Sequence, residues 1–175
     1  MRGLVDSMAE NHSEEDSILP THSSFGHSLR QLNRLIQRDL GLRIAHMGVS
    51  LGQWYALRTL WARDGLTQVE LAHASGIAGP AMVVAVRSLI AAGLVRRRRD
   101  RNDARKYIVS LTKKGQQLQT AALEAAIAAN RDALQGIPAE DVAVCMRVLH
   151  QAQHNLLTVG IPVDSEDDVD KLLGT

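Results

Sequence analysis

Six arginines fall within ten positions of the chain, from Arg96 to Arg105. A guanidinium group is planar and permanently charged, and it pairs with two phosphate oxygens at once, so such a cluster is typical of nucleic-acid recognition. Residues 94–115 carry nine Lys and Arg against two Asp, a net charge of +7, whereas the whole chain carries only +1. A charge run can also be a plain solvated face, but this density favours phosphate binding.

Both ends of the chain carry the opposite charge. Residues 1–22 and residues 161–175 each contain one basic and five acidic residues. We expect an acidic disordered arm over 1–22 and an acidic tail over 161–175. The single cysteine, Cys145, excludes an internal disulfide. No apolar run approaches the roughly 20 residues that cross a bilayer, so we expect a cytoplasmic protein without a membrane partner.

The residues before the arginine cluster predict three helices. Ser50 to Gln53 and Thr67 to Glu70 are capping boxes, in which two side chains satisfy backbone amides at a helix start. The second of these helices is short, from Gln68 to about Ala74. Gly79-Pro80 then begins a third helix, with Pro80 at the first helical position.

The arginine cluster itself is expected to form a β-hairpin. Tyr107, Val109 and Leu111 alternate with Lys106, Ile108 and Ser110, which predicts a strand over 106–111 paired with one over 94–98, and residues 100–103 are turn-forming. Two short helices joined by a tight turn and followed by a basic hairpin form a helix-turn-helix with a wing. We assign this winged helix-turn-helix DNA-binding lobe to residues 49–111.

Longer helices are expected on both sides of the lobe. Apolar residues recur at steps of three and four over residues 23–48, which predicts one amphipathic helix. Residues 112–160 predict two more, the first from Thr112 to about Gln135. The fold class is therefore mainly α with a small β-hairpin wing, a winged helix-turn-helix with flanking dimerisation helices.

The sequence resembles a known family in a set of short segments. These are Leu66 to Ala72, Ser75-Gly76-Ile77, Ala92 to Arg97, Asp100, Asp103-Ala104-Arg105 and Val109 to Gly115. With them, the chain is similar to the MarR family of winged-helix transcription regulators over residues 23–158. The resemblance implies a homodimer, held by the first helix and the last two, that binds double-stranded DNA with the helix after Gly79 as its recognition helix.

The resemblance also implies a set of DNA-binding residues. It places them at Thr67, Gln68, Ala81, Val83, Val84, Arg87, Ser88, Arg97, Arg98, Arg99, Arg101 and Arg105, with Asp103 and Arg105 as the pair that stiffens the wing. The chain departs from the family in the recognition helix, where Ser, Thr and Arg are usual and Ala81, Val83 and Val84 stand here. These side chains can touch thymine methyl groups but cannot hydrogen-bond to bases.

Members of the family commonly bind a small aromatic acid, which suggests a ligand site. Trp54, Arg58 and Trp61 share one helical face, and Arg30 and Arg34 on the first helix are further cations. The alternative is that the tryptophans are core residues and the arginines are solvated. For each of these residues taken alone, the alternative is favoured. We expect a ligand-responsive repressor that a small aromatic acid releases from its operator.

Other functions have weaker support. His150 and His154 have a spacing that can bind a metal from one helix face, so a metal-responsive regulator is one alternative. A winged-helix module that binds protein instead of DNA is another, although it has no need of the arginine cluster. Cys145 falls on the apolar stripe of the last helix, where a core role is expected. No catalytic or phosphate-binding motif is present, so we expect neither an enzyme nor a cofactor.

Overall fold

The computed structural model describes residues 24–100, 103 and 105–159. The predicted acidic arm and tail, and the predicted DNA-binding residue Arg101, lie outside these residues. The chain divides into two compact units, residues 1–38 and 39–175. Helix α1 (Phe25–Ala45) begins in the first unit and ends in the second, three residues before the predicted end at Gly48. In the first unit α1 exposes the large apolar side chains of Phe25, Leu29, Leu32 and Leu35.

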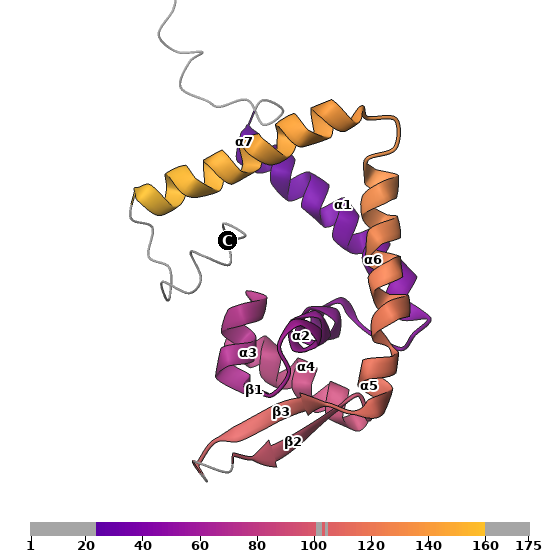
Figure 1. Cartoon of the computed structure of the whole chain (residues 1–175), viewed down its shortest axis with the longest axis vertical. Coiled ribbons are helices and arrows are strands. Elements are labelled where there is room, and N and C mark those ends of the chain that lie inside the picture. The colour runs from indigo at the N-terminus through magenta and orange to yellow at the C-terminus, as the bar shows by residue number, and fades with distance from the viewer. Residues whose placement is uncertain (1–23, 101–102, 104, 160–175) are drawn as a thin grey trace, which may run out of the picture. The chain divides into compact units, whose positions relative to one another are not determined.

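The second unit contains the predicted winged helix-turn-helix. Its elements are α2 (Leu51–Ala62), β1 (Leu66–Thr67), α3 (Gln68–Ser75), α4 (Gly79–Ala91), β2 (Val95–Arg99) and β3 (Tyr107–Leu111). The antiparallel sheet has the order β1-β3-β2, with Arg99 opposite Tyr107 at the end of the hairpin. In Figure 1 the hairpin begins beside α5 and projects past α3 and α4.

Both predicted capping boxes are present. At α2 the Ser50 amide donates to Gln53 Oε1 over 2.7 Å, and the Gln53 amide donates to Ser50 Oγ. At α3 the Thr67 amide donates to the Glu70 carboxylate over 2.7 Å, and this bond holds the pKa of Glu70 below its ordinary value. Helix α4 begins at Gly79, so Pro80 is its second residue, not its first. Either position suits proline, because the first amides of a helix lack internal partners.

The core of the lobe comes from the inner faces of α2, α3 and α4. Trp54, Leu57, Leu60 and Leu71 are buried there, together with Met82, Val86 and Leu89 on the inner face of α4. Gln53 is the buried polar residue of this core, and its Nε2 donates to Ser88 Oγ over 2.7 Å. This bond ties α2 to α4 without leaving a buried amide unsatisfied.

One strand was not predicted. Strand β1 has only two residues, and Leu66 pairs with Val109 of β3. Two residues cannot show the alternation that identifies a strand in a sequence. The strand depends on the tertiary arrangement, which includes a bond from the Leu111 amide to Asp64 Oδ1.

The segment that joins the hairpin to the next helix binds the end of α4. Thr112 Oγ1 donates to the carbonyl of Gly93, and Lys114 Nζ donates to the carbonyl of Ala92. The backbone of Gly115 approaches the Leu94 carbonyl so closely that a Cβ atom would clash with the carbonyl oxygen. The Gly115 carbonyl in turn accepts a 3.0 Å bond from Trp61 Nε1 on α2. This junction therefore fastens the hairpin to both α2 and α4.

The helix predicted over 112–135 is divided in two. Helices α5 (Lys113–Gln117) and α6 (Gln119–Ala133) meet at Leu118. Leu118 keeps a right-handed helical conformation, with φ −72° and ψ −20°, so the division is a small irregularity. No glycine or proline lies at this point, and the sequence therefore carried no signal for it.

The last helix packs little of its surface within the chain. Helix α7 (Ala139–Thr158) has no buried residue, and Cys145, which was expected in a core, is exposed. Near the end of α6, Arg43 bridges Asp132 and Asp39, at 2.6 Å from each carboxylate. The Arg43 guanidinium lowers the pKa of Asp132 and ties the second unit's part of α1 to α6.

Among the described residues, no single helix is long and apolar enough to cross a membrane. Helices α3 and α4 reach the required length and composition only as a pair, and that pair is bent by 112°.

The first prediction concerns Gly115. Replacing Gly115 with Ala should lower the free energy of unfolding by about 2 kcal/mol, because a Cβ forces the junction away from the Leu94 carbonyl. Urea unfolding followed by circular dichroism measures the change. Gly52→Ala is the matched control, since a Cβ there meets nothing within 4 Å. Equal stability of the two variants would contradict the importance of the close approach.

Candidate nucleic-acid interface and ligand pocket

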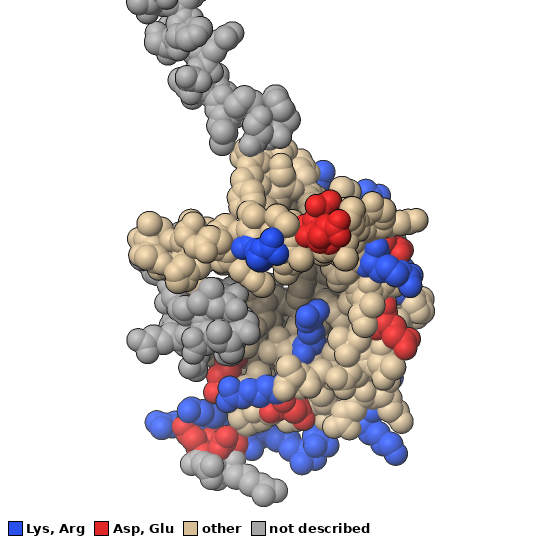
Figure 2. All heavy atoms as spheres, turned by 45° about the horizontal axis from the view of Figure 1, so that its top comes forward, with Lys and Arg blue, Asp and Glu red and all other residues tan. Residues whose placement is uncertain are grey.

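The wing presents a row of arginines. Arg96 to Arg99 are consecutive on β2, and all four side chains are exposed. Because side chains alternate along a strand, Arg97 and Arg99 share one face of the hairpin, and Arg96 and Arg98 share the other. Lys and Arg side chains gather along the lower edge of the molecule in Figure 2, the end that carries the hairpin in Figure 1. The described part of the wing can therefore offer cations on both faces.

Tyr107 organises two of these arginines. The Cζ atom of Arg97 lies 3.9 Å from the centroid of the Tyr107 ring, and that of Arg99 lies 5.8 Å from it. Arg99 Nε also donates to the Tyr107 hydroxyl over 3.4 Å. This hydrogen bond, with the positive charge of Arg99, lowers the pKa of Tyr107. This role of Tyr107 was not predicted from the sequence, although a tyrosine opposite arginines in a hairpin is a recognisable cross-strand pair.

The turn of the wing is held by aspartates. Asp103 Oδ1 accepts bonds from the Arg105 amide at 3.0 Å and from Arg105 Nε at 3.3 Å. The Asp103 amide donates to Asp100 Oδ1 over 3.1 Å. The structure thus brings together Asp103 and Arg105, the pair expected to stiffen the wing. Arg105 keeps 92% of its side chain exposed, so the pairing leaves its guanidinium accessible.

The proposed recognition helix exposes mostly apolar side chains. Ala81, Val83, Val84 and Arg87 of α4 are all exposed. Arg87 forms no hydrogen bond or ion pair with the residues that the structure describes. The Ser88 hydroxyl accepts the bond from Gln53 and therefore lies on the flank of α4 that faces α2. Of the two polar residues expected to read bases, only Arg87 has its side chain uncommitted within the described chain.

The start of α3 lies between α4 and the wing. Thr67 is engaged in its capping box, and Gln68 is half-buried. Gln68 and Val69 line two hollows, one of ≈ 570 Å³ shared with Val83 and one of ≈ 450 Å³ shared with Arg97. Val69, which the sequence analysis did not single out, is 79% exposed. Val69, the second residue of α3, thus lies between the exposed surface of α4 and that of the wing.

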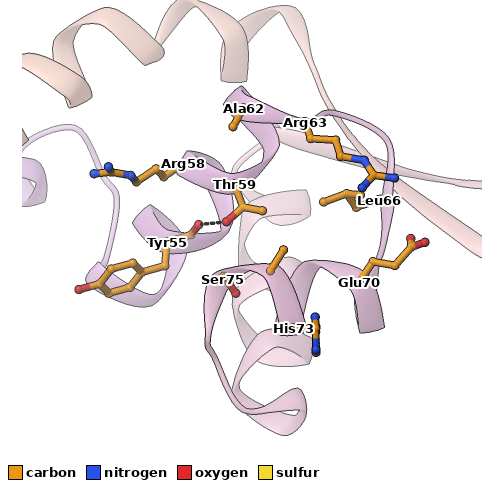
Figure 3. Close-up of a pocket in the computed structure, with 10 residues that line it drawn as sticks. Tyr55, Arg58, Thr59, Ala62, Arg63, Leu66, Glu70, His73 and Ser75 are labelled. Atoms are coloured by element: carbon orange, nitrogen blue, oxygen red, sulfur yellow. Dashed lines mark hydrogen bonds between the residues drawn. The ribbon is translucent and has the colours of Figure 1, made fainter. Parts of the chain in front are cut away.

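A larger pocket of ≈ 630 Å³ lies between α2 and α3. Figure 3 shows Tyr55 and Arg58 on one side of it and Arg63 and Glu70 on the other, with His73 on α3 facing the space between. Its lining therefore combines an aromatic ring and two arginines with one carboxylate, that of Glu70. Because the arginines outnumber the carboxylate, the pocket can hold a planar anion.

Trp54, Arg58 and Trp61 lie together as expected, but they form no open slot. The Cζ atom of Arg58 lies 6.0 Å from the centroid of the Trp54 ring, and Arg58 lines the pocket, whereas Trp54 is only 1% exposed and lies in the core. Trp61 packs edge-on against Trp54, with ring centroids 5.7 Å apart, and its Nε1 donates a hydrogen bond to the Gly115 carbonyl. Tyr55, the residue after Trp54, is the aromatic residue in the pocket. Arg30 and Arg34 belong to the first unit and are exposed there, and their part in a ligand site stays a prediction.

His150 and His154 are both exposed on α7. Within the described residues, no group of three or more His, Cys, Asp or Glu side chains is placed to hold a metal ion. The two histidines therefore have no third ligand among these residues.

Three helices and a basic antiparallel hairpin in this order define a winged-helix protein with the features of a DNA-binding lobe. The MarR family model matches residues 47–106. The solved transcriptional regulator PA3341 is 33% identical, covering 77% of this chain and 99% of its own, with a TM-score of 0.67. A MarR regulator from Methanosarcina mazei Go1 is 27% identical, covering 77% of this chain and 96% of its own, with a TM-score of 0.70. The chain belongs to the MarR family of transcription regulators, and the predicted winged-helix fold is confirmed.

A more distant neighbour shows the same fold. BpsR from Bordetella bronchiseptica is 20% identical, covering 73% of this chain and 96% of its own, with a TM-score of 0.66. The DNA binding of BpsR is regulated by 6-hydroxynicotinic acid.

The second prediction concerns the pairing of Tyr107 with Arg99. Arg99→Met should raise the pKa of Tyr107, because it removes both the hydrogen bond and the nearby charge. Arg98→Met makes the same change of charge on the opposite face of β2 and should leave the pKa of Tyr107 where it is. NMR titration of protein with ¹³C-labelled tyrosine measures this simply, since the chain has two tyrosines. Equal effects of the two variants would show that Tyr107 does not organise the wing.

Proposed function

We propose that this MarR-family protein binds double-stranded DNA as a homodimer and represses transcription until a small aromatic acid releases it. The main observation in favour of DNA binding is the row of four exposed arginines on β2, beside a helix-turn-helix. Such a row supplies phosphate contacts, which position a protein on a duplex and make its affinity depend on salt. The fastening of the hairpin at Gly115 supports the proposal, since it limits the motion of the wing relative to α4.

The dimer is proposed from uncovered apolar surface. Helix α7 exposes Val144, Met146, Val148 and Leu156, and α1 in the first unit exposes a further apolar series. Separate exposed apolar residues are ordinary, but a continuous apolar helix face such as that of α1 is typical of protein interfaces. A second copy of the chain is the expected partner, because a two-fold dimer presents two recognition helices to a near-palindromic site. We include a cytoplasmic location in the same proposal, because a regulator of transcription must reach the DNA.

The ligand is proposed to bind between α2 and α3. Its carboxylate would pair with Arg58 or Arg63, and its ring would lie against Tyr55. BpsR, whose DNA binding responds to 6-hydroxynicotinic acid, supports an aromatic acid as the class. Arg30 and Arg34 remain proposed further cations. This site replaces the tryptophan slot of the sequence analysis, since Trp54 has no accessible face.

A ligand at this pocket has a route to the recognition helix. It can change DNA affinity only by binding one arrangement of the protein better than another. Helix α2 carries the pocket residue Arg58 and, one and a half turns earlier, Gln53, which bonds Ser88 of α4. A shift of α2 would therefore be transmitted to α4 through this partly buried hydrogen bond.

The third prediction tests DNA binding by the wing. In the double variant Arg98→Ala, Arg99→Ala, affinity for every duplex should fall, and the slope of log affinity against log salt should decrease by about one unit per lost phosphate contact. Fluorescence anisotropy over a series of salt concentrations measures both quantities. The double lysine variant at the same positions keeps the charge and should keep most of the slope. An alanine variant with the parent's slope would mean that the wing does not touch DNA.

The fourth prediction tests the ligand pocket. Arg58→Ala should abolish release from DNA by an aromatic acid while leaving DNA affinity intact, because it removes a cation from the pocket and none from the wing. Calorimetry with 6-hydroxynicotinate, benzoate and hydroxybenzoates identifies the compound, and anisotropy in its presence follows release. Arg87→Ala, on the exposed face of α4, is the matched control and should weaken DNA binding without affecting ligand binding. Failure of all compounds to bind, or a normal response of Arg58→Ala, would overturn the assignment.

A further inference from the structure

The recognition helix of this chain lacks the side chains that normally read bases. From Ile77 to Val86, no side chain contains a nitrogen or oxygen atom, and the first one that does is Arg87. In a helix-turn-helix, the N-terminal residues of the recognition helix contact the base edges in the major groove. Over its first two turns, α4 therefore cannot form a side-chain hydrogen bond to any base.

The same turns expose branched apolar side chains. Val83 is 44% exposed and Val84 66%, and Val69 at the start of α3 is 79% exposed. We call these three residues the valine surface. Val69 and Val83 line the same hollow, so they are neighbours although they come from different helices. Valine is a weak helix former, so three exposed valines in two short helices do not help these helices to form.

Charge around the valine surface indicates what covers it. Val69 also lines the hollow in which Arg97, Arg105 and Lys106 outnumber one carboxylate, that of Glu70, so the surface continues directly into the basic wing. Arg87 is one helical turn from Val83 and Val84 and is exposed. A surrounding of cations suits a polyanion and disfavours an apolar protein or a membrane interior as the occupant. The occupant that fits is the major groove of a DNA duplex, as the proposed function requires.

We propose that the valine surface recognises operators through the 5-methyl groups of thymines. Thymine differs from the other DNA bases in displaying a methyl group in the major groove, and an apolar side chain that covers it gains affinity by removing it from water. Val83 and Val84 on α4, with Val69 on α3, are the specificity-determining residues, and Arg87 is the hydrogen-bonding side chain beside them. 5-Methylcytosine displays the same methyl group, so it can replace the methyl of a contacted thymine, whereas uracil cannot.

The experiment compares duplexes that differ only in methyl groups. A duplex selected by the protein from a random pool is synthesised with thymine or with uracil in its half-sites, and dissociation constants are measured by anisotropy at one salt concentration. We expect uracil to weaken binding about fourfold for each contacted methyl group. Uracil placed only in the flanks outside the half-sites is the control for changes in duplex stiffness and should have no effect.

A variant separates the valine surface from the rest of the interface. In Val83→Thr, Val84→Thr, each side chain keeps its shape but has a hydroxyl group in place of one of its two methyl groups, so the preference for thymine over uracil should fall while the salt slope stays unchanged. Equal binding of thymine and uracil duplexes by the parent protein would overturn the inference and leave DNA binding by the wing intact. The inference rests on the proposed function, and the absence of binding to any duplex would overturn both. The uracil comparison needs no variant, so it stands even where the double variant does not fold.

Discussion

The backbone contact between Gly115 and Leu94 determines how the hairpin is attached to the helices. Only a residue without a Cβ can approach the Leu94 carbonyl so closely. Beside this contact, Thr112 and Lys114 bond the carbonyls of Gly93 and Ala92, which directly follow α4, and the Gly115 carbonyl accepts a bond from Trp61 on α2. A segment of four residues thereby fixes the hairpin to α2 and to the end of α4. The positions of the wing and of the recognition helix on a duplex depend on this arrangement.

Affinity and sequence preference are carried by different parts of the interface in this account. The arginines of β2, two of them held by Tyr107, supply charge that no base sequence alters. The valine surface supplies contacts that depend on which bases carry a methyl group. The pocket between α2 and α3 shares His73 with the hollow of Val69 and Val83, and it shares Glu70 with the hollow of Arg97. We propose that a ligand there changes DNA binding through these residues of α3 and through the bond from Gln53 to Ser88.

Local patterns predicted much of the lobe, because the interactions that start and stop its helices lie within a few residues. The capping boxes at Ser50 and Thr67 are of this kind, and both are present. Strand β1, the Tyr107 stack and the pocket depend on residues far apart in the chain. Helical spacing put Trp54 and Arg58 on one face, but it could not show that the ring turns into the core while the guanidinium remains outside. Tyr55, which follows Trp54 in the chain and lines the pocket, is therefore the aromatic residue proposed to bind the ligand.

We propose that the protein binds DNA with the arginines of its wing on the phosphates and the valine surface on thymine methyl groups. The most direct test is NMR of the complex between protein with ¹³C-labelled valine methyls and a selected, unlabelled duplex. We expect nuclear Overhauser effects from the methyls of Val83 and Val84 to thymine 5-methyl protons, which requires that the groups lie in contact. A stable complex in which these valines show effects only to sugar protons, or none to DNA, would contradict the account.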